Sequence, residues 1–191
     1  MTSFYTEQEL KELGLKKYGA NVLISRKCSI YGASQISIGD SVRIDDFCIL
    51  SGNITIGNYV HISAYTSMFS GDAYITIGDF VALSSRNVIY AESDDYSGKS
   101  MVNPMVPNEY KDLQKGDVFV GRHSIIGTGS TILPGVIIGE GVAVGAMSLI
   151  NKDLEQWTIN AGIPCKKLKE RERQPLEYEK EFLAQQMKQG K

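Results

Sequence analysis

The sequence has few of the residues that mark membrane-spanning, metal-binding or disulfide-rich proteins. Its 191 residues include 3 cysteines and 2 histidines, and no cysteine pair has zinc-site or disulfide-framework spacing. No apolar run reaches the roughly 18 residues that a membrane-spanning helix needs. No basic segment followed by an apolar one opens the chain. We therefore expect a cytoplasmic protein with no metal ion and no membrane span.

The charge is almost balanced, with 20 Lys and Arg against 22 Asp and Glu, a net charge of -2 and a pI near 5.7. Proteins that bind nucleic acid or anionic membranes usually show a basic excess. We therefore expect no nucleic-acid partner. The length suits a single domain with a sizeable core.

A six-residue repeat runs from Val120 to Glu155. Each unit opens on an aliphatic residue, and glycine commonly follows it. A period of six fits neither an amphipathic helix nor an alternating strand. It is typical of a parallel β-helix, in which three units close one coil. The opening residues are Val120, Ile126, Ile132, Ile138, Val144 and Ile150.

The same phase continues toward the N-terminus. Ile56 follows Ile38 by 18 residues, which is one coil, and Ile77 follows Ile56 by 21. Val120 follows Ile77 by 43 residues, which is one coil plus a long insertion. The sequence therefore predicts an all-β solenoid, a parallel β-helix over residues 20–155.

Three segments depart from the repeat. Residues 1–19 are expected to cap the first coil with a short helix, because Thr6 and Glu9 form a capping-box pattern. Residues 92–117 contain two prolines and few aliphatic residues, which predicts a long functional loop that interrupts the coils. Residues 156–191 are expected to form an extension and a C-terminal helix, packed on the coils or on a neighbouring subunit.

Three motifs in the second half resemble those of the hexapeptide-repeat acyltransferases, in particular the galactoside- and maltose-type sugar O-acetyltransferases. The resemblance implies a left-handed β-helix, acetyl-CoA as the acyl donor, and direct transfer to a sugar. It also implies a homotrimer with its sites between subunits, where the long loop covers the active site. The motifs are Ile132-Leu133-Pro134-Gly135-Val136, Gly145-Ala146-Met147-Ser148 and Ala161-Gly162-Ile163-Pro164-Cys165-Lys166-Lys167-Leu168-Lys169.

The resemblance also implies where the donor binds. Glycine and alanine let a thin pantetheine arm approach the backbone, and clustered lysines suit phosphate. The alternative is that these are ordinary repeat positions and a solvated charge run. The implied residues are Thr128, Gly145 and Ala146 along the arm, Asn151 and Lys152 further along it, and Lys166 and Lys169 near the coenzyme A phosphates.

The catalytic histidine of this family is missing. Its position falls at Asp94 or Asp95, and no histidine occurs between His61 and His123. Asp94 could bind or deprotonate the acceptor with Asp95 beside it, or the pair could serve only as turn residues. His123, expected at a corner and facing outward just after the loop, could be the base instead. His61, on an earlier coil and also facing outward, could line the acceptor site.

The missing histidine favours an amine acceptor. An amine with a pKa of about 8 is roughly one-tenth neutral at pH 7, whereas a hydroxyl needs a positioned base worth about 10²–10⁴-fold. We therefore expect an amino sugar, with a nucleotide-linked sugar of surface polysaccharide synthesis as one candidate. Arg86, expected to face outward near the loop base, could bind a diphosphate or carboxylate, or form a structural salt bridge.

Two other functions stay open: a sugar O-acetyltransferase that uses His123 as its base, and a catalytically silent β-helix scaffold. The γ-type carbonic anhydrases share the fold, but their zinc needs three histidines and this chain has 2.

Overall fold

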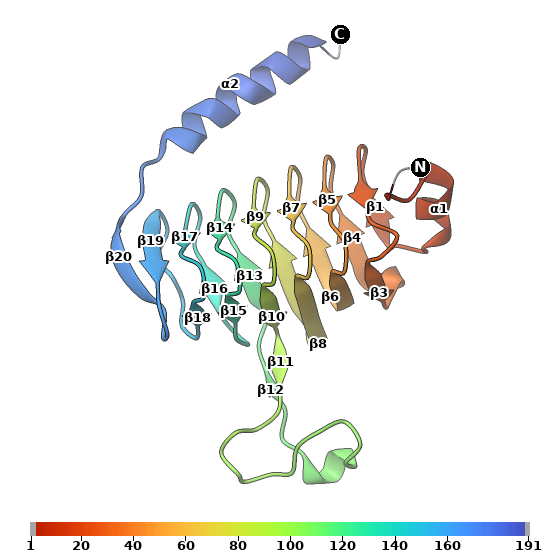
Figure 1. The fold of residues 1–191 in the computed structure, drawn as a ribbon, viewed down its shortest axis with the longest axis vertical. Helices are drawn as coiled ribbons and strands as arrows, with labels where there is room; N and C mark the ends of the chain where they lie inside the picture. The colour runs from red at the N-terminus through yellow and green to blue at the C-terminus, as the bar shows by residue number, and fades with distance from the viewer. Residues whose placement is uncertain (1–2, 190–191) are drawn as a thin grey trace.

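In a computed structural model, which describes residues 3–189, the chain winds into a β-solenoid of about seven coils (Figure 1). Short strands of successive coils pair in parallel along the stack. The left-handed sense of winding stays what the resemblance implies. One face is an eight-stranded sheet of β2 (Leu23–Ile24), β5 (Arg43–Ile44), β7 (His61–Ile62), β9 (Ala82–Leu83), β14 (Ile125–Ile126), β17 (Ala143–Val144), β19 (Thr158–Ala161) and the antiparallel β20 (Lys166–Glu170).

A ten-stranded sheet covers the other two faces, because β6 and β8 bend around an edge. The first part of β6 pairs with β3, and its second part pairs with β4. The strands are β1 (Lys17–Tyr18), β3 (Ser29–Tyr31), β4 (Ile36–Ile38), β6 (Ile49–Ile56), β8 (Ser67–Ile77), β10 (Val88–Tyr90), β13 (Val118–Val120), β15 (Thr131–Ile132), β16 (Ile137–Ile138) and β18 (Leu149–Ile150).

The predicted register is confirmed along one column of the core. Ile38 pairs with Ile56, and Ile56 pairs with Ile77. Ile77 then pairs with Val120 across the insertion, and Val120 pairs with Ile138. All five side chains are buried, and full burial of such a side chain is worth about 1.5–3 kcal/mol. The stack of aliphatic columns therefore holds the coils together.

The chain turns at three edges that run along the stack, where residues adopt positive φ. Backbone hydrogen bonds link each edge from coil to coil; for example, the Arg86 N–H donates to the Ala64 carbonyl (3.0 Å). The first edge consists of Asn21, Ser41, Tyr59, Phe80, His123, Gly141 and Trp157. The second edge consists of Phe47, Tyr65, Arg86, Gly129 and Met147, and the third of Gly32, Gly52, Gly71 and Gly135.

The N-terminal segment caps the stack as predicted. Helix α1 (Glu7–Glu12) begins after Thr6, whose hydroxyl accepts a hydrogen bond from the Glu9 N–H (3.3 Å). The Glu9 carboxylate accepts one from the Thr6 N–H in return (2.6 Å), which completes the capping box. Leu10 is buried in the core cluster. A 3₁₀ turn, η1 (Ala33–Gln35), follows in the first coil.

The insertion leaves the solenoid at the third edge and stands away from its body (Figure 1). Its base is an antiparallel pair, β11 (Glu92–Ser93) with β12 (Gln114–Lys115), and a 3₁₀ turn, η2 (Asn108–Tyr110), lies beyond it. The Gly116 N–H donates to the Ala91 carbonyl (3.0 Å) where the two ends meet. The sequence predicted the insertion but not its two-stranded base.

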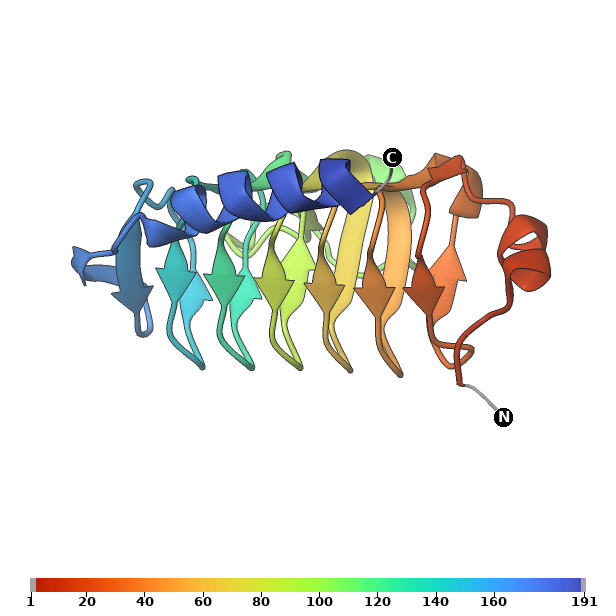
Figure 2. The same ribbon diagram turned by 90° about the horizontal axis from the view of Figure 1, so that it is seen from above.

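The predicted C-terminal helix is α2 (Gln174–Gln189), and it runs back along the coils (Figure 2). The Arg173 guanidinium lies over the Trp157 ring (5.9 Å), and the Phe182 ring packs edge-on against Tyr59 (5.1 Å between centroids). The helix therefore packs on the first edge of its own chain. Among residues 3–189, no helix has the length and apolar character needed to cross a membrane.

Candidate active site

A cavity of about 960 Å³ lies between the insertion and the coils at the third edge. Asp94 lines it from the insertion, while Leu133 and Asn151 line it from the solenoid. One Asp94 oxygen accepts a hydrogen bond from the Asn103 N–H (3.3 Å). Its other oxygen accepts no hydrogen bond from residues 3–189. Asp94 therefore offers a free carboxylate oxygen next to an open space.

Asp95 lines the same cavity, but its carboxylate is more fully hydrogen-bonded. Its carboxylate accepts hydrogen bonds from the Ser97 N–H and hydroxyl (both 2.8 Å), from the Lys99 N–H and from the Ser100 hydroxyl (both 3.2 Å). These bonds, those of Ser97 first, hold the pKa of Asp95 below its usual range. All of these partners lie within residues 97–100, so the bonds stabilise a turn of the insertion, as in the alternative that Asp95 is only a turn residue. Substrate binding by Asp95 stays a prediction.

His123 points out of its coil, as expected, but it is not open to solvent. It does occupy a corner, on the first edge, but α2 covers it and its side chain is 8% exposed. Its Nε2 lies 2.9 Å from Oε2 of Glu179, and its ring stacks on Phe80 (5.0 Å between centroids). The cavity with Asp94 lies at another edge. The geometry therefore gives His123 a role in helix packing and does not support it as the base.

His61 faces outward from β7, as expected. Its Nε2 lies 2.8 Å from an Asp45 oxygen, and the other oxygen accepts a hydrogen bond from Arg43 (2.7 Å). Burial works against the charge on Asp45, but the hydrogen bonds from Arg43 and His61 keep its pKa below the usual value. A substrate role for His61 stays a prediction.

The structure corrects the expected surroundings of Arg86. The side chain is exposed as predicted, but it belongs to the second edge, and β10 separates it from the base of the insertion. The alternative of a structural salt bridge is also not met, because no carboxylate among residues 3–189 pairs with it. Arg86 is therefore a free cation on an exposed edge.

The predicted donor residues fall into two groups. Thr128, Gly145 and Ala146 lie at the second edge, where the Thr128 hydroxyl donates to the Ser85 carbonyl of the preceding coil (2.6 Å). A Cβ on Gly145 would lie 2.9 Å from that of Ala161, so close packing of the coils by itself explains this glycine. The side chains of Thr128 and Ala146 are exposed on neighbouring coils of the second edge. They border a strip of this edge, called the donor lane below, that is open to a thin ligand.

Asn151 and Lys152 do not continue this lane. They follow β18 and lie at its far end, toward the third edge, and Asn151 lines the cavity with Asp94. Within one chain they lie apart from Thr128 and Ala146, and their place further along the pantetheine arm stays a prediction.

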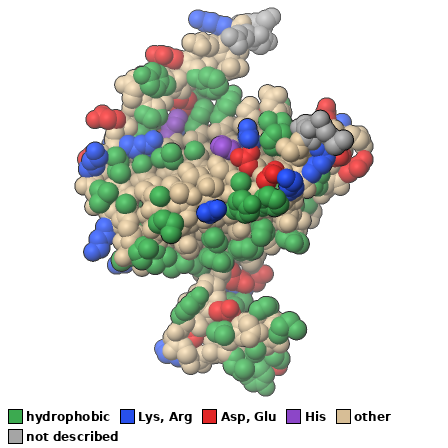
Figure 3. Space-filling view, viewed as in Figure 1, with side chains coloured by type: hydrophobic (Ala, Val, Ile, Leu, Met, Phe, Trp, Pro, Cys, Tyr) green, Lys and Arg blue, Asp and Glu red, His purple; other side chains and the backbone are tan. Residues whose placement is uncertain are grey.

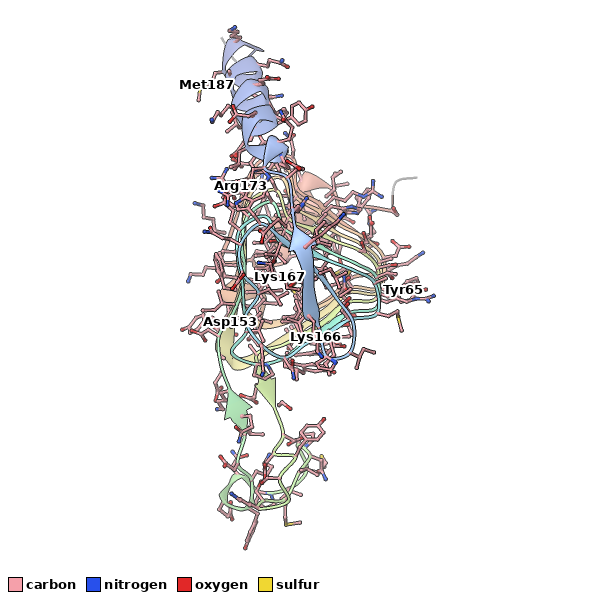
Figure 4. The ribbon with its side chains drawn as sticks, turned by 90° about the vertical axis from the view of Figure 1, so that its left-hand side faces the viewer. Tyr65, Asp153, Lys166, Lys167, Arg173 and Met187 are labelled. Atoms are coloured by element: carbon pink, nitrogen blue, oxygen red, sulfur yellow. The ribbon has the colours of Figure 1, made fainter. Side chains whose placement is uncertain are left out.

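The three lysines of β20 differ in their partners. Lys167 pairs with Glu155 (2.9 Å) and Glu170 (2.7 Å). Lys166 and Lys169 are exposed, and no carboxylate among residues 3–189 pairs with either of them. Figure 4 shows Lys166 and Lys167 on the last coil. Two of the three lysines are thus available to an anion. Within residues 3–189, no cluster of three or more His, Cys, Asp or Glu could hold a metal ion.

The fold and length of the chain match those of AntD, an N-acyltransferase from Bacillus cereus. A crystal structure of AntD in complex with dTDP and 3-hydroxybutyryl-CoA is 51% identical, with a TM-score of 0.96, and covers 97% of this chain and 99% of that one. AntD has also been crystallised with its Asp94 replaced by Ala or Asn, in complex with dTDP and coenzyme A. A form with its Ser84 replaced by Ala was crystallised with dTDP-4-amino-4,6-dideoxyglucose and coenzyme A.

This chain has an aspartate at 94 and a serine at 84 as well. Ser84 directly follows β9, and its carbonyl accepts hydrogen bonds from the Asn87 side chain (2.7 Å) and the Thr66 hydroxyl (3.2 Å). Ser84 is not among the site residues predicted from the sequence. A signal was available, because Ser84 is second in its repeat unit, where Gly127 and Gly145 stand in theirs.

Curated relatives agree with this match. An Escherichia coli dTDP-4-amino-4,6-dideoxy-D-glucose acyltransferase is 48% identical over 94% of this chain and 95% of its own length. The E. coli K12 protein WbbJ, named as a lipopolysaccharide biosynthesis O-acetyl transferase, is 30% identical over 77% of this chain and 78% of its own. The family model for the bacterial transferase hexapeptide (six repeats) matches residues 117–152. The chain belongs to the hexapeptide-repeat acyltransferases.

Proposed function

We propose that this chain transfers an acyl group from coenzyme A to the amine of dTDP-4-amino-4,6-dideoxyglucose or a closely similar nucleotide-linked amino sugar. One observation carries the proposal: the chain is about half identical, over nearly its whole length, to two N-acyltransferases of this kind. The similarity extends through the insertion, where Asp94 stands in place of the family histidine. The amine acceptor expected from that replacement agrees with both relatives.

The reaction needs little from the protein beyond placement. The neutral amine attacks the thioester carbonyl, a C–N bond forms, the C–S bond breaks, and coenzyme A leaves as its thiolate. The nitrogen loses one proton, which the thiolate ultimately takes up. The free oxygen of Asp94 can accept a hydrogen bond from the amine and orient it for attack, which is the role we propose for this residue.

The donor is an acyl-CoA. We propose that Thr128 and Ala146 flank the pantetheine arm on the second edge and that Lys166 and Lys169 bind phosphates at the last coil. Acetyl was expected from the resemblance, whereas AntD was crystallised with 3-hydroxybutyryl-CoA. Comparison of the two donors in the same assay decides the acyl group.

We also propose a homotrimer with its sites between subunits. Within one chain, Asp94 and Asn151 lie toward the third edge, whereas Ser84, Thr128 and Ala146 lie at the second. The third edge of one copy placed against the second edge of the next would bring the two groups together. The insertion also carries unburied apolar side chains (Figure 3), such as Met105, which is 90% exposed. We keep a cytoplasmic location as part of this proposal.

The test measures coenzyme A release and product mass for the full chain with dTDP-4-amino-4,6-dideoxyglucose. The matched control acceptor is dTDP-6-deoxyglucose, which has a hydroxyl in place of the amine. Turnover of the amine alone, with an amide product, is expected. Ester formation on the control would show that the enzyme is an O-acyltransferase. The absence of turnover with any acyl-CoA would favour the alternative of a catalytically silent β-helix scaffold.

Shared sites predict a second result. We propose Ser84, the residue also replaced in AntD, as a second member of the acceptor site. Co-expression of two copies, Asp94→Ala and Ser84→Ala, each expected to be inactive alone, should restore part of the activity, because some sites then combine an intact Asp94 with an intact Ser84. Mixed trimers as inactive as either parent would argue that each chain holds a whole site.

A further inference from the structure

The second edge carries two uncovered aromatic rings on its N-terminal coils. Phe47 and Tyr65 stack on each other, with ring centroids 5.0 Å apart and planes 23° from parallel. They are 46% and 52% exposed, and Figure 4 shows Tyr65 on an edge away from both α2 and the insertion. Both residues adopt positive φ, which is uncommon for bulky side chains. The stacked pair is therefore held outward at a conformational cost.

The comparable rings of the first edge have an evident packing role. Tyr59 and Phe80 also stack at positive φ, but Phe182 of α2 packs across both of them. Within residues 3–189, no such segment lies over Phe47 and Tyr65, so the fold of this chain gives no reason for them.

Two cations lie beside the rings, and they differ in their partners: Lys27 pairs with Asp46 (2.9 Å), whereas Arg86 is available. Lys27 lies over the Phe47 ring (5.2 Å), and Arg86 follows Tyr65 on the next coil without a carboxylate partner among the described residues. Asp46, beside Phe47, is already bound by Ser25 (2.5 Å) and Lys27 (2.9 Å). A planar guanidinium with free donors suits a diphosphate.

The order of groups along this edge matches the order of groups in a nucleotide sugar. The rings come first, Arg86 is on the next coil, and Ser84 is on that same coil. Thr128 and Ala146 follow on the next two coils toward the lysines of β20. Neighbouring coils are about 4.8 Å apart, the spacing of paired strands. The base, diphosphate and amino sugar can therefore lie in this order from the N-terminal coils toward Ser84. The donor approaches the same point from the C-terminal coils.

We propose that Phe47, Tyr65 and Arg86 form the subsite for the nucleoside diphosphate of the acceptor. The open face of the Tyr65 ring stacks on the nucleobase, Phe47 supports that ring from its other face, and Arg86 binds the diphosphate. This inference rests on the proposed function. It adds that nucleotide recognition lies on the N-terminal coils of the second edge, separate from the donor lane on the C-terminal coils.

The test measures binding of dTDP and, separately, of coenzyme A to the full chain by calorimetry. Loss of one base–aromatic stack should weaken dTDP binding roughly 5- to 150-fold in Tyr65→Ala, while Tyr65→Phe keeps the ring and binds nearly as well. Arg86→Ala should weaken binding of both dTDP and inorganic pyrophosphate, whereas Tyr65→Ala should weaken dTDP alone. Coenzyme A binding should be unchanged in all three variants.

Tyr31→Ala is the matched control, because this tyrosine is also exposed (60%, against 52% for Tyr65) and lies on β3, off the second edge. Full dTDP affinity in Tyr65→Ala would overturn the inference while leaving the proposed function intact. A Tyr65→Ala protein whose oligomeric state changes along with its dTDP affinity would assign the rings to a subunit contact instead, which also overturns it. Wild-type protein that binds coenzyme A but not dTDP would refute the proposed function itself.

Discussion

Glu179 of α2 approaches His123 with its Oε2 atom, 2.9 Å from the Nε2 atom of the ring, and it also contacts the guanidinium of Arg122. One carboxylate thus ties the C-terminal helix to the edge of a coil more than fifty residues earlier in the chain. The sequence offered His123 as a possible general base. A base and a helix-packing residue differ in the property that substitution of His123 should change: kcat in the first case, stability in the second.

His123→Ala should lower the free energy of unfolding by about 1–3 kcal/mol, because it leaves a buried carboxylate contact unmade and removes a stacked ring. Its kcat should change little. Chemical unfolding and acyl-transfer rates measured on the same preparation check both parts. A large loss of kcat with unchanged stability would restore His123 as the base.

Asp94→Asn should lower kcat with the amino sugar by about 10²-fold or more if the carboxylate orients the amine or accepts its proton. The amide keeps the size of the side chain and the bond from Asn103, so the fold and both affinities should persist. Steady-state rates together with binding constants for each substrate separate these effects. Equal kcat in wild type and Asp94→Asn would remove Asp94 from the reaction.

The turn that Asp95 stabilises in the insertion should become less stable at low pH. The folded pKa of Asp95 lies below the usual value because the Ser97 N–H and hydroxyl donate to it. The contribution is therefore complete above about pH 4, the pKa of an unfolded aspartate, and is lost as pH falls through the lower folded value. Amide resonances of Ser97 and Lys99 should report the loss. Asp112→Asn is the control, since that exposed carboxylate holds no turn.

Lys166→Ala and Lys169→Ala should each weaken acyl-CoA binding roughly twofold to fivefold, and more at low salt than at high salt. Lys167→Ala should do less, because that lysine is already paired with Glu155 and Glu170. Calorimetric titration with coenzyme A at two salt concentrations makes the comparison. Equal effects of all three substitutions would show that only the net charge matters.

Thiol labelling should separate the cysteines. Burial raises the pKa of Cys28 to about 12 and that of Cys48 to about 11, so neither should react with a thiol reagent before the protein unfolds. Cys165 is only half-buried, and burial also raises its pKa, so it should react slowly in the native state. Reaction of all three thiols at one rate in the folded protein would contradict this. Cys165→Ser should remove the background in assays that detect released coenzyme A.

The sequence predicted the solenoid well because a fixed period states which residues stack. The pairing of Ile77 with Val120 across 43 residues follows from phase alone. The sequence could not show that β10 separates Arg86 from the insertion, because the period alone does not tell which residues lie at which edge of a coil. Nor could it place Glu179 on His123, since no period links a helix to the edge it covers.

The candidate site was predicted unevenly for a similar reason. Asp94 was found because a family residue was missing at a countable position. Ser84 was overlooked because a serine in a repeat looks like any other small residue. Ala146 and Asn151 lie at two different edges. This depends on where each repeat unit turns in space, which the repeat pattern does not predict.

The hydrogen bond from the Gly116 N–H to the Ala91 carbonyl closes the insertion at its base. The register of the coils on either side is therefore independent of what lies between these two residues. Loop closure costs grow slowly with length, so lengthening or shortening this segment should change the stability of the stack little. Residues 94–113 can therefore be exchanged as a unit, and the coils on either side should keep their register.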